Sequence, residues 1–273
     1  MNSRVRLLAT LLIVSILVII GAIILTFYWE DIFIGQNEEM DIPLQVARDE
    51  VIKDIESFKM RKLVRENRGL ILRRENFTQI SDYQKYVTPN DPVVTGYLSA
   101  NGITSMQQAY VSAVQWIWVS DLILHSKSEF WMMPSAFIQD SPNDPDNPIP
   151  GSMVSDCESQ AYTLVSLLEV LGTSKTNVRV VVGEVDFSGE IGGHAWVQIY
   201  QNNQWFELDA TSGPFWDDED ETLVSNSGFP FNYFKTHPYP VLEYWAFFND
   251  QYYYNPHNQK KSPNLPIHWL EET

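Results

Sequence analysis

The sequence predicts an α+β fold, with helices in the first part of the chain and strands in the second. Two observations indicate this class. As far as Leu168, apolar residues recur at the three- and four-residue spacing of amphipathic helices. From Val178 onward, apolar and polar residues alternate, as they do in half-buried strands. With 273 residues and a hydrophobic content of 44%, the chain is long and apolar enough to bury a sizeable core.

The elements follow in a definite order along the globular part of the sequence. A helix is expected to begin after Ser105, because Ser105 and Gln108 have the spacing of a capping box. The segment SPNDPDNPIPG, residues 141–151, is too rich in Pro, Asn and Asp for a helix or a strand, so we expect a loop. The next helix carries Cys157. Strands are expected at residues 178–187, 194–200 and 205–210, and a hairpin at residues 241–248 and 251–254.

An apolar run without charges, residues 7–27, stands near the start of the sequence. Its length matches a membrane-spanning helix of roughly 20 residues and exceeds the apolar region of a cleaved secretory signal. Arg4 and Arg6 precede the run, and the next basic residue is Arg48. By the positive-inside rule, we expect a single-pass protein of the cell membrane, with its N-terminus in the cytoplasm and its main domain outside.

The charge is concentrated in the second part of the chain. Residues 86–273 carry the whole formal charge of −17, because acidic and basic side chains are equal in number before them. An acidic domain repels phosphate backbones, so nucleic acid is a poor partner. We therefore divide the chain into a cytoplasmic N-terminus (1–6), a transmembrane helix (7–27), a connector (28–41), a helical stalk or packing region (42–100) and a globular domain (101–273).

The chain has one cysteine, Cys157, which excludes an intramolecular disulfide and any multi-cysteine zinc site. Ser155 and Glu158 have capping-box spacing, so we expect Ser155 to be the N-cap and Cys157 the second residue of its helix. There the helix dipole would lower the thiol pKa below about 8.5, and unpaired N–H groups could hold an oxyanion. A lone cysteine near a helix start is more often structural, so the nucleophile hypothesis needs a base.

A base and an orienting group are found on the predicted strands. His194 stands near the start of one strand, in GGHAWVQIY, and Asp209 ends the next, in WFELDAT. If the link QNNQ forms a loop of even length, Tyr200 pairs with Trp205. The same register makes His194 a diagonal neighbour of Asp209 on one face of the sheet, whereas an odd loop would put them on opposite faces. The order Cys157, His194, Asp209 therefore predicts a catalytic triad.

The blocks DCESQA, GGHAWVQIY and WFELDAT resemble those of the transglutaminase-like superfamily, and the first also resembles its bacterial cysteine proteinases. The resemblance covers about residues 105–215, with its motif core at 151–211, and the aromatic-rich extension 213–273 lies largely outside it. It implies a papain-like α+β core, with the cysteine-bearing helix packed on an antiparallel sheet. It also implies that Cys157 is the nucleophile, His194 the base and acid, and Asp209 the group that orients His194. Ser155 stands where many members have glycine, which leaves the subclass open.

The expected reaction is acyl transfer from an amide through a thioester. Water as acceptor makes a peptidase or amidase, and an amine makes a transglutaminase. We expect extracytoplasmic proteins or envelope peptides as substrates. Trp131 is a candidate second oxyanion donor because of its upstream position. The alternatives are a catalytically silent binding module at the cell surface and a metal site built on the triad residues, which lack zinc-site spacing.

No cofactor is expected, and calcium is the candidate cation because some members of the superfamily use it. Two acidic loops contain clustered carboxylates, Asp140, Asp144 and Asp146 in the first and residues 217–221 (DDEDE) in the second. Neither has the central glycine of an EF-hand, so solvated loops are the simpler interpretation.

Overall fold

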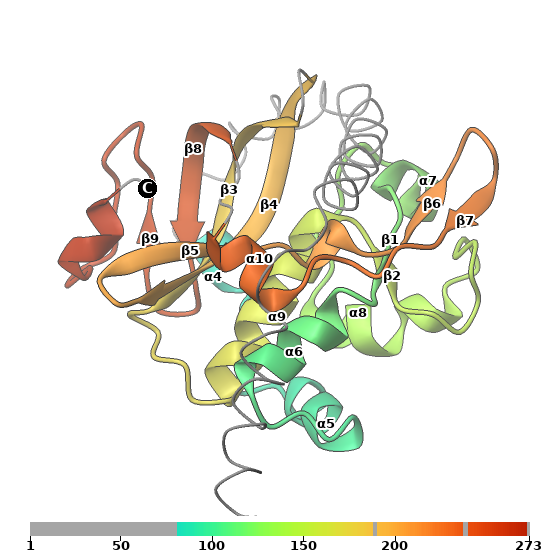
Figure 1. Ribbon diagram of the computed structural model, residues 1–273, viewed down its shortest axis with the longest axis horizontal. Coiled ribbons are helices and arrows are strands. Elements are labelled where there is room, and N and C mark those ends of the chain that lie inside the picture. Colours follow the sequence, from blue (N-terminus) through green and yellow to red (C-terminus); the bar gives the residue numbers. More distant parts are fainter. Residues whose placement is uncertain (1–80, 188–189, 237–239, 272–273) are drawn as a thin grey trace, which may run out of the picture. The chain divides into compact units, whose positions relative to one another are not determined.

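The computed structural model describes residues 81–187, 190–236 and 240–271 (Figure 1). The predicted transmembrane helix (7–27), the connector (28–41) and most of the 42–100 region lie outside the described residues. In the part that is described, no helix is both long enough and apolar enough to cross a membrane.

The first half of the described chain is helical, as the sequence predicts. The longest helix, α9, begins at Cys157 and buries nearly every one of its residues. Ser105 caps α6, since its hydroxyl accepts a hydrogen bond from the Gln108 N–H at 3.3 Å. The helices are α4 (Ser81–Gln84), α5 (Pro92–Ala100), α6 (Met106–Ala113), α7 (Asp121–His125), α8 (Pro134–Gln139), α9 (Cys157–Val170) and α10 (Phe231–Thr236), with 3₁₀ turns η1 (Ser141–Asn143), η2 (Ala210–Ser212) and η3 (Ile267–Leu270).

The second half forms an antiparallel sheet of five strands in the order β5-β4-β3-β8-β9, which confirms the α+β class. A smaller sheet has the order β2-β1-β6-β7 and pairs β1 in parallel with β2 and β6. The strands are β1 (Ile117–Trp118), β2 (Val154–Ser155), β3 (Val178–Phe187), β4 (Glu190–Gln201), β5 (Gln204–Leu208), β6 (Phe215–Asp217), β7 (Thr222–Val224), β8 (Val241–Phe248) and β9 (Tyr253–Tyr254).

The register between β4 and β5 is the predicted one. Tyr200 pairs with Trp205 across a two-residue turn, and the register continues to Val197 opposite Leu208. Asn202 and Asn203 both have positive φ, 54° and 61°, which is the backbone that a tight hairpin turn requires and that Asn tolerates. The polar link QNNQ thus fixes which face of the sheet each side chain of β4 and β5 occupies.

The two faces of the large sheet have different coverings. Helix α9 packs against β3 and β4, and Figure 1 shows it lying beside these strands. Val180 and Arg179 are neighbours on β3, so they point to opposite faces. The Arg179 guanidinium is fully buried and contacts the rings of Trp205, Phe247 and Trp269. Because Trp269 belongs to η3, this C-terminal turn covers the face of the sheet to which Arg179 points.

Two local features differ from, or add to, the predicted organisation. The loop at residues 141–151 is irregular as expected, except that Ser141–Asn143 forms the 3₁₀ turn η1.

The described part of the 42–100 region packs on the globular domain. The Thr88 N–H donates to the Ser166 hydroxyl of α9 at 2.9 Å, and the Tyr83 ring contacts Trp131 and Phe248.

Candidate active site

Cys157 is the first residue of α9, with Asp156 as the N-cap. The predicted capping box does not form. Ser155 belongs to β2 and pairs with Trp118 of β1, and its hydroxyl donates to the Asp156 carbonyl at 3.3 Å. Because Ser155 pairs with a strand far away in the sequence, it does not cap the helix. The cysteine still stands in the first turn, where backbone N–H groups have no partner within the helix.

The surroundings of the thiol reverse the predicted direction of its pKa. Burial raises the pKa of Cys157 well above its ordinary value, and the negative charges of Glu158 and Asp156 raise it further. A hydrogen bond with the backbone of Ala195 acts in the opposite direction. The thiol is 2% exposed, and its sulfur lies 3.4 Å from Glu158 Oε2. The field of the helix terminus is thus outweighed by desolvation and by adjacent carboxylates.

Those carboxylates belong to an acidic cluster of Glu129 and Glu158, which are buried, and Asp156, which is half-buried. Burial raises the pKa of Glu129 and of Asp156, and in each the charge of nearby carboxylates adds to the effect. Burial also opposes ionisation of Glu158, but hydrogen bonds from Asp156 and Glu129 outweigh it and lower the pKa of Glu158. One oxygen of Asp156, Oδ1, is buried without a hydrogen-bond partner. Within the cluster, Glu158 is therefore the carboxyl that ionises most readily.

His194 and Asp209 meet as the strand register predicts. His194 Nε2 lies 3.1 Å from Asp209 Oδ2, and the two residues are 4% and 1% exposed. The other carboxylate oxygen, Asp209 Oδ1, accepts from the Thr211 N–H at 2.7 Å and from the Thr211 hydroxyl at 2.8 Å. The Tyr110 hydroxyl donates to the Asp209 carbonyl at 3.3 Å. Asp209 is thus held on both sides, in a position from which it can orient the imidazole.

The sulfur and the imidazole belong to adjoining parts of the structure. Ala195, whose backbone bonds to the Cys157 thiol, is the residue directly after His194 on β4. The first turn of α9 therefore lies against the part of β4 that carries the histidine. Because Nε2 faces Asp209, the ring nitrogen suited to exchanging a proton with a thiol is Nδ1.

Trp131 is engaged within the acidic cluster. Its indole N–H donates to Glu129 Oε1, and its ring contacts Tyr86 and Tyr162. An N–H that already serves a carboxylate is not available to a reacting oxygen in this arrangement. We therefore do not assign Trp131 as the second oxyanion donor.

Several residues of the site were missed in the sequence. Two of them could have been found from the sequence. The β4–β5 register places Glu207 opposite Gln198, and Thr211 follows Asp209 at the spacing of a side-chain hydrogen bond to the backbone N–H two residues on. Glu129 had no such signal, since it comes from a segment between α7 and α8 and reaches the cysteine only through the tertiary fold. Trp196, whose ring is parallel to that of His194, lies in the block GGHAWVQIY, but the sequence alone does not indicate its contact with His194.

The two acidic loops considered for calcium use their carboxylates within their own turns. Asp144 Oδ1 accepts from the Asp146 N–H at 2.9 Å, and Asp217 Oδ1 accepts from the N–H groups of Glu219 and Asp220. Among the described residues, no group of three or more His, Cys, Asp or Glu side chains is preformed to hold a metal ion. We therefore derive no catalytic step through a metal.

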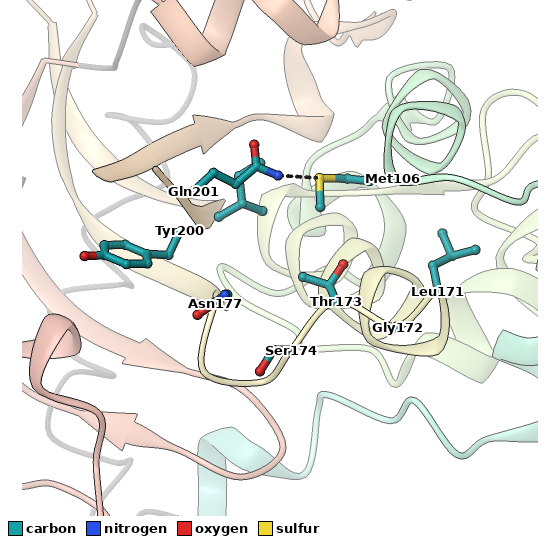
Figure 2. A pocket seen from close by; sticks show the side chains of 9 residues that line it. Met106, Leu171, Gly172, Thr173, Ser174, Asn177, Tyr200 and Gln201 are labelled. Carbon is teal, nitrogen blue, oxygen red and sulfur yellow. Dashed lines mark hydrogen bonds between the residues drawn. The ribbon is translucent and has the colours of Figure 1, made fainter. Parts of the chain in front are cut away.

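A surface pocket of about 360 Å³ lies at the other end of α9 (Figure 2). Its lining includes Leu171, Gly172 and Thr173, which follow the helix, together with Met106 and Gln201, whose side chains meet across it. Because α9 has 14 residues, this pocket is about 20 Å from Cys157. It is therefore separate from the candidate active site.

Comparison with known proteins identifies no family. No protein-family model matches the sequence, and no characterised protein matches it. Among solved structures, the chain is similar to LapG of Legionella pneumophila in a calcium-bound structure, an EGTA-treated structure and a third structure. The three matches have 14%, 14% and 15% identity and TM-scores of 0.40, 0.40 and 0.39. They cover 68–70% of this chain and 90–92% of the LapG chains, and at these TM-scores we draw no argument from them.

Proposed function

We propose that this chain is a transglutaminase-like cysteine enzyme that cleaves or transfers amide bonds. Cys157 is the nucleophile, His194 the base and acid, and Asp209 the group that orients the imidazole. The observation that carries the proposal is the buried His194–Asp209 pair, with 3.1 Å between Nε2 and Oδ2, next to the backbone that bonds the only thiol of the chain. A papain-like arrangement of the α+β core is part of this proposal.

The reaction begins with proton transfer from the Cys157 thiol to His194 Nδ1. The thiolate then attacks the carbonyl carbon of a substrate amide, and the oxyanion is held by backbone N–H groups at the start of α9. His194 gives the proton to the leaving nitrogen as the C–N bond breaks, which leaves a thioester on Cys157. Water or an amine, deprotonated by His194, then attacks the thioester and restores the thiol. Asp209 stabilises the imidazolium formed in each step.

Burial and the charges of Glu158 and Asp156 raise the pKa of Cys157 and so oppose formation of the thiolate. The proposed reaction therefore depends on His194 to accept the thiol proton. No cofactor is part of the proposal.

We place the reaction outside the cytoplasm, on neighbouring proteins or envelope peptides. This follows from the predicted membrane helix at 7–27 and from the arginines that precede it. The alternative is a surface binding module without activity. The buried His194–Asp209 bond favours an enzyme, because a module kept for recognition has no need of an oriented imidazole.

Product analysis tests the proposal. The full-length chain in detergent micelles is incubated with casein and a fluorescent primary amine, with and without calcium. A peptidase releases new N-termini and a transglutaminase attaches the amine to casein, and Cys157→Ser should abolish either product. Formation of neither product by the wild type, with calcium present and the protein folded, would favour the binding module.

A further inference from the structure

The indole of Trp196 and the imidazole of His194 are neighbours and nearly parallel. Their ring centroids are 5.8 Å apart with an interplanar angle of 15°, and Trp196 is fully buried. The neighbouring strand makes room for this ring. A Cβ added to Gly183, which pairs with His194, would lie 3.1 Å from the Trp196 ring and 2.5 Å from the Glu243 carbonyl oxygen. The orientation of the imidazole thus depends on where Trp196 is held.

A buried carboxylate fixes the other edge of that indole. Trp196 Nε1 donates to Glu207 Oε2, and Gln198 Nε2 donates to Glu207 Oε1 at 2.7 Å. Glu207 is 1% exposed. A carboxylate that is itself held by a second donor fixes the position of the indole more closely than packing alone.

The same hydrogen-bond chain continues to the C-terminal segment. Gln198 Oε1 accepts from Arg179 Nε at 2.7 Å. The Arg179 guanidinium donates to the carbonyls of Trp269 at 3.0 Å and Glu271 at 3.4 Å. It is also sandwiched between the rings of Trp205 and Phe247, at 3.7 and 3.8 Å from their centroids. An unbroken series of contacts therefore joins His194 to η3.

We propose that Glu207 is a positioning residue for His194, acting through Trp196, and that Gln198 and Arg179 tie this support to the C-terminal turn η3. The inference rests on the proposed function of His194. A wholly apolar layer would stabilise the sheet at least as well as this buried polar series, so stability alone does not account for it. Burial raises the pKa of Glu207 to about 7, although hydrogen bonds from Gln198 and Trp196 lower it. Keeping an ionised carboxylate at this buried position therefore costs free energy of folding.

The test uses the labelling rate of Cys157 by iodoacetamide in the full-length chain, measured from pH 5 to pH 10 by intact mass. The label is specific because the chain has one cysteine. Glu207→Gln replaces one of the two carboxylate oxygens, the acceptors at this position, with an amide NH₂ group. Trp196→Phe keeps an aromatic ring beside His194 but removes the indole N–H. Glu243→Gln is the matched control, because Glu243 accepts from the Trp245 indole at 2.6 Å on a different strand. Thermal unfolding of every variant is measured alongside.

Glu207→Gln and Trp196→Phe should each lower the labelling rate at neutral pH by roughly tenfold, as misplaced reacting groups do. The double variant should fall no further than either single one, because both break the same support. Glu243→Gln should leave the rate unchanged. If His194→Ala lowers labelling while Glu207→Gln and Trp196→Phe lower only the melting temperature, Glu207 is a structural residue and the inference is wrong. If His194→Ala itself has no effect, the proposed function fails.

Discussion

Glu169 offers a quantitative test of the electrostatics of α9, at the end remote from the cysteine. Its side chain is 1% exposed, and both carboxylate oxygens are buried without a hydrogen bond. Lys175 Nζ lies 3.6 Å from Glu169 Oε2 and also pairs with Asp250. Burial raises the pKa of Glu169 to about 8, and the charge of Asp250 adds to the rise while Lys175 lowers it.

The sign follows from proton linkage. The folded chain holds a proton on Glu169 that the unfolded chain loses above a pKa of about 4.5, so wild-type stability falls as the pH rises from about 4.5 to 8. At about 1.4 kcal/mol per pKa unit, the upper limit is about 5 kcal/mol. The pKa of about 8 already includes the lowering by Lys175, and relaxation of the structure around the ionised carboxylate reduces the effect further, so we expect about 2–3 kcal/mol. Glu169→Gln does not titrate and should escape this loss.

Thermal unfolding followed by tryptophan fluorescence at pH 5 and pH 8.5 measures the effect on the full-length chain. The two proteins should melt together at pH 5, because Glu169 is then neutral in the folded state. At pH 8.5 the variant should melt about 5–10 °C higher. Asp250→Asn, which removes the repelling charge, should reduce the pH dependence of the wild type. Parallel melting curves for wild type and Glu169→Gln at both pH values would refute the reasoning.

Two further outcomes are expected. Glu158→Gln removes the nearest charge that raises the Cys157 pKa, so the iodoacetamide labelling rate at pH 7 should rise, and an unchanged or lower rate would contradict that cause. Gly183→Ala should lower the free energy of unfolding by about 2–4 kcal/mol in thermal melts, because its Cβ meets backbone, and an unaffected melt would mean that β3 and β8 separate easily.

The fold could be predicted wherever local pattern and turn chemistry agreed. The alternation in β3, β4 and β8 and the Asn-Asn turn between β4 and β5 determine strands and register without reference to the rest of the chain. That register was enough to bring His194 to Asp209. Interactions within a few residues, or across one tight hairpin, are visible in a single sequence.

The features that were wrong depend on segments distant in sequence. Ser155 has the spacing of an N-cap, but pairing with Trp118, far earlier in the chain, draws it into β2. The thiol pKa was expected to be low, but Glu129 joins Asp156 and Glu158 around it and burial removes the solvent. Neither the β1–β2 pairing nor the convergence of three carboxylates leaves a periodic signal, so both required the structure.

The central claim is that Cys157 and His194 act as a pair, and the pH dependence of thiol labelling tests it most directly. Wild type and His194→Ala are compared as full-length chains. The account predicts that the labelling rate at neutral pH is at least about tenfold lower in the variant than in the wild type, with the apparent thiol pKa of the variant shifted upward. Identical profiles in two folded proteins, or labelling that appears only on unfolding, would show that the thiol is structural and that no pair exists.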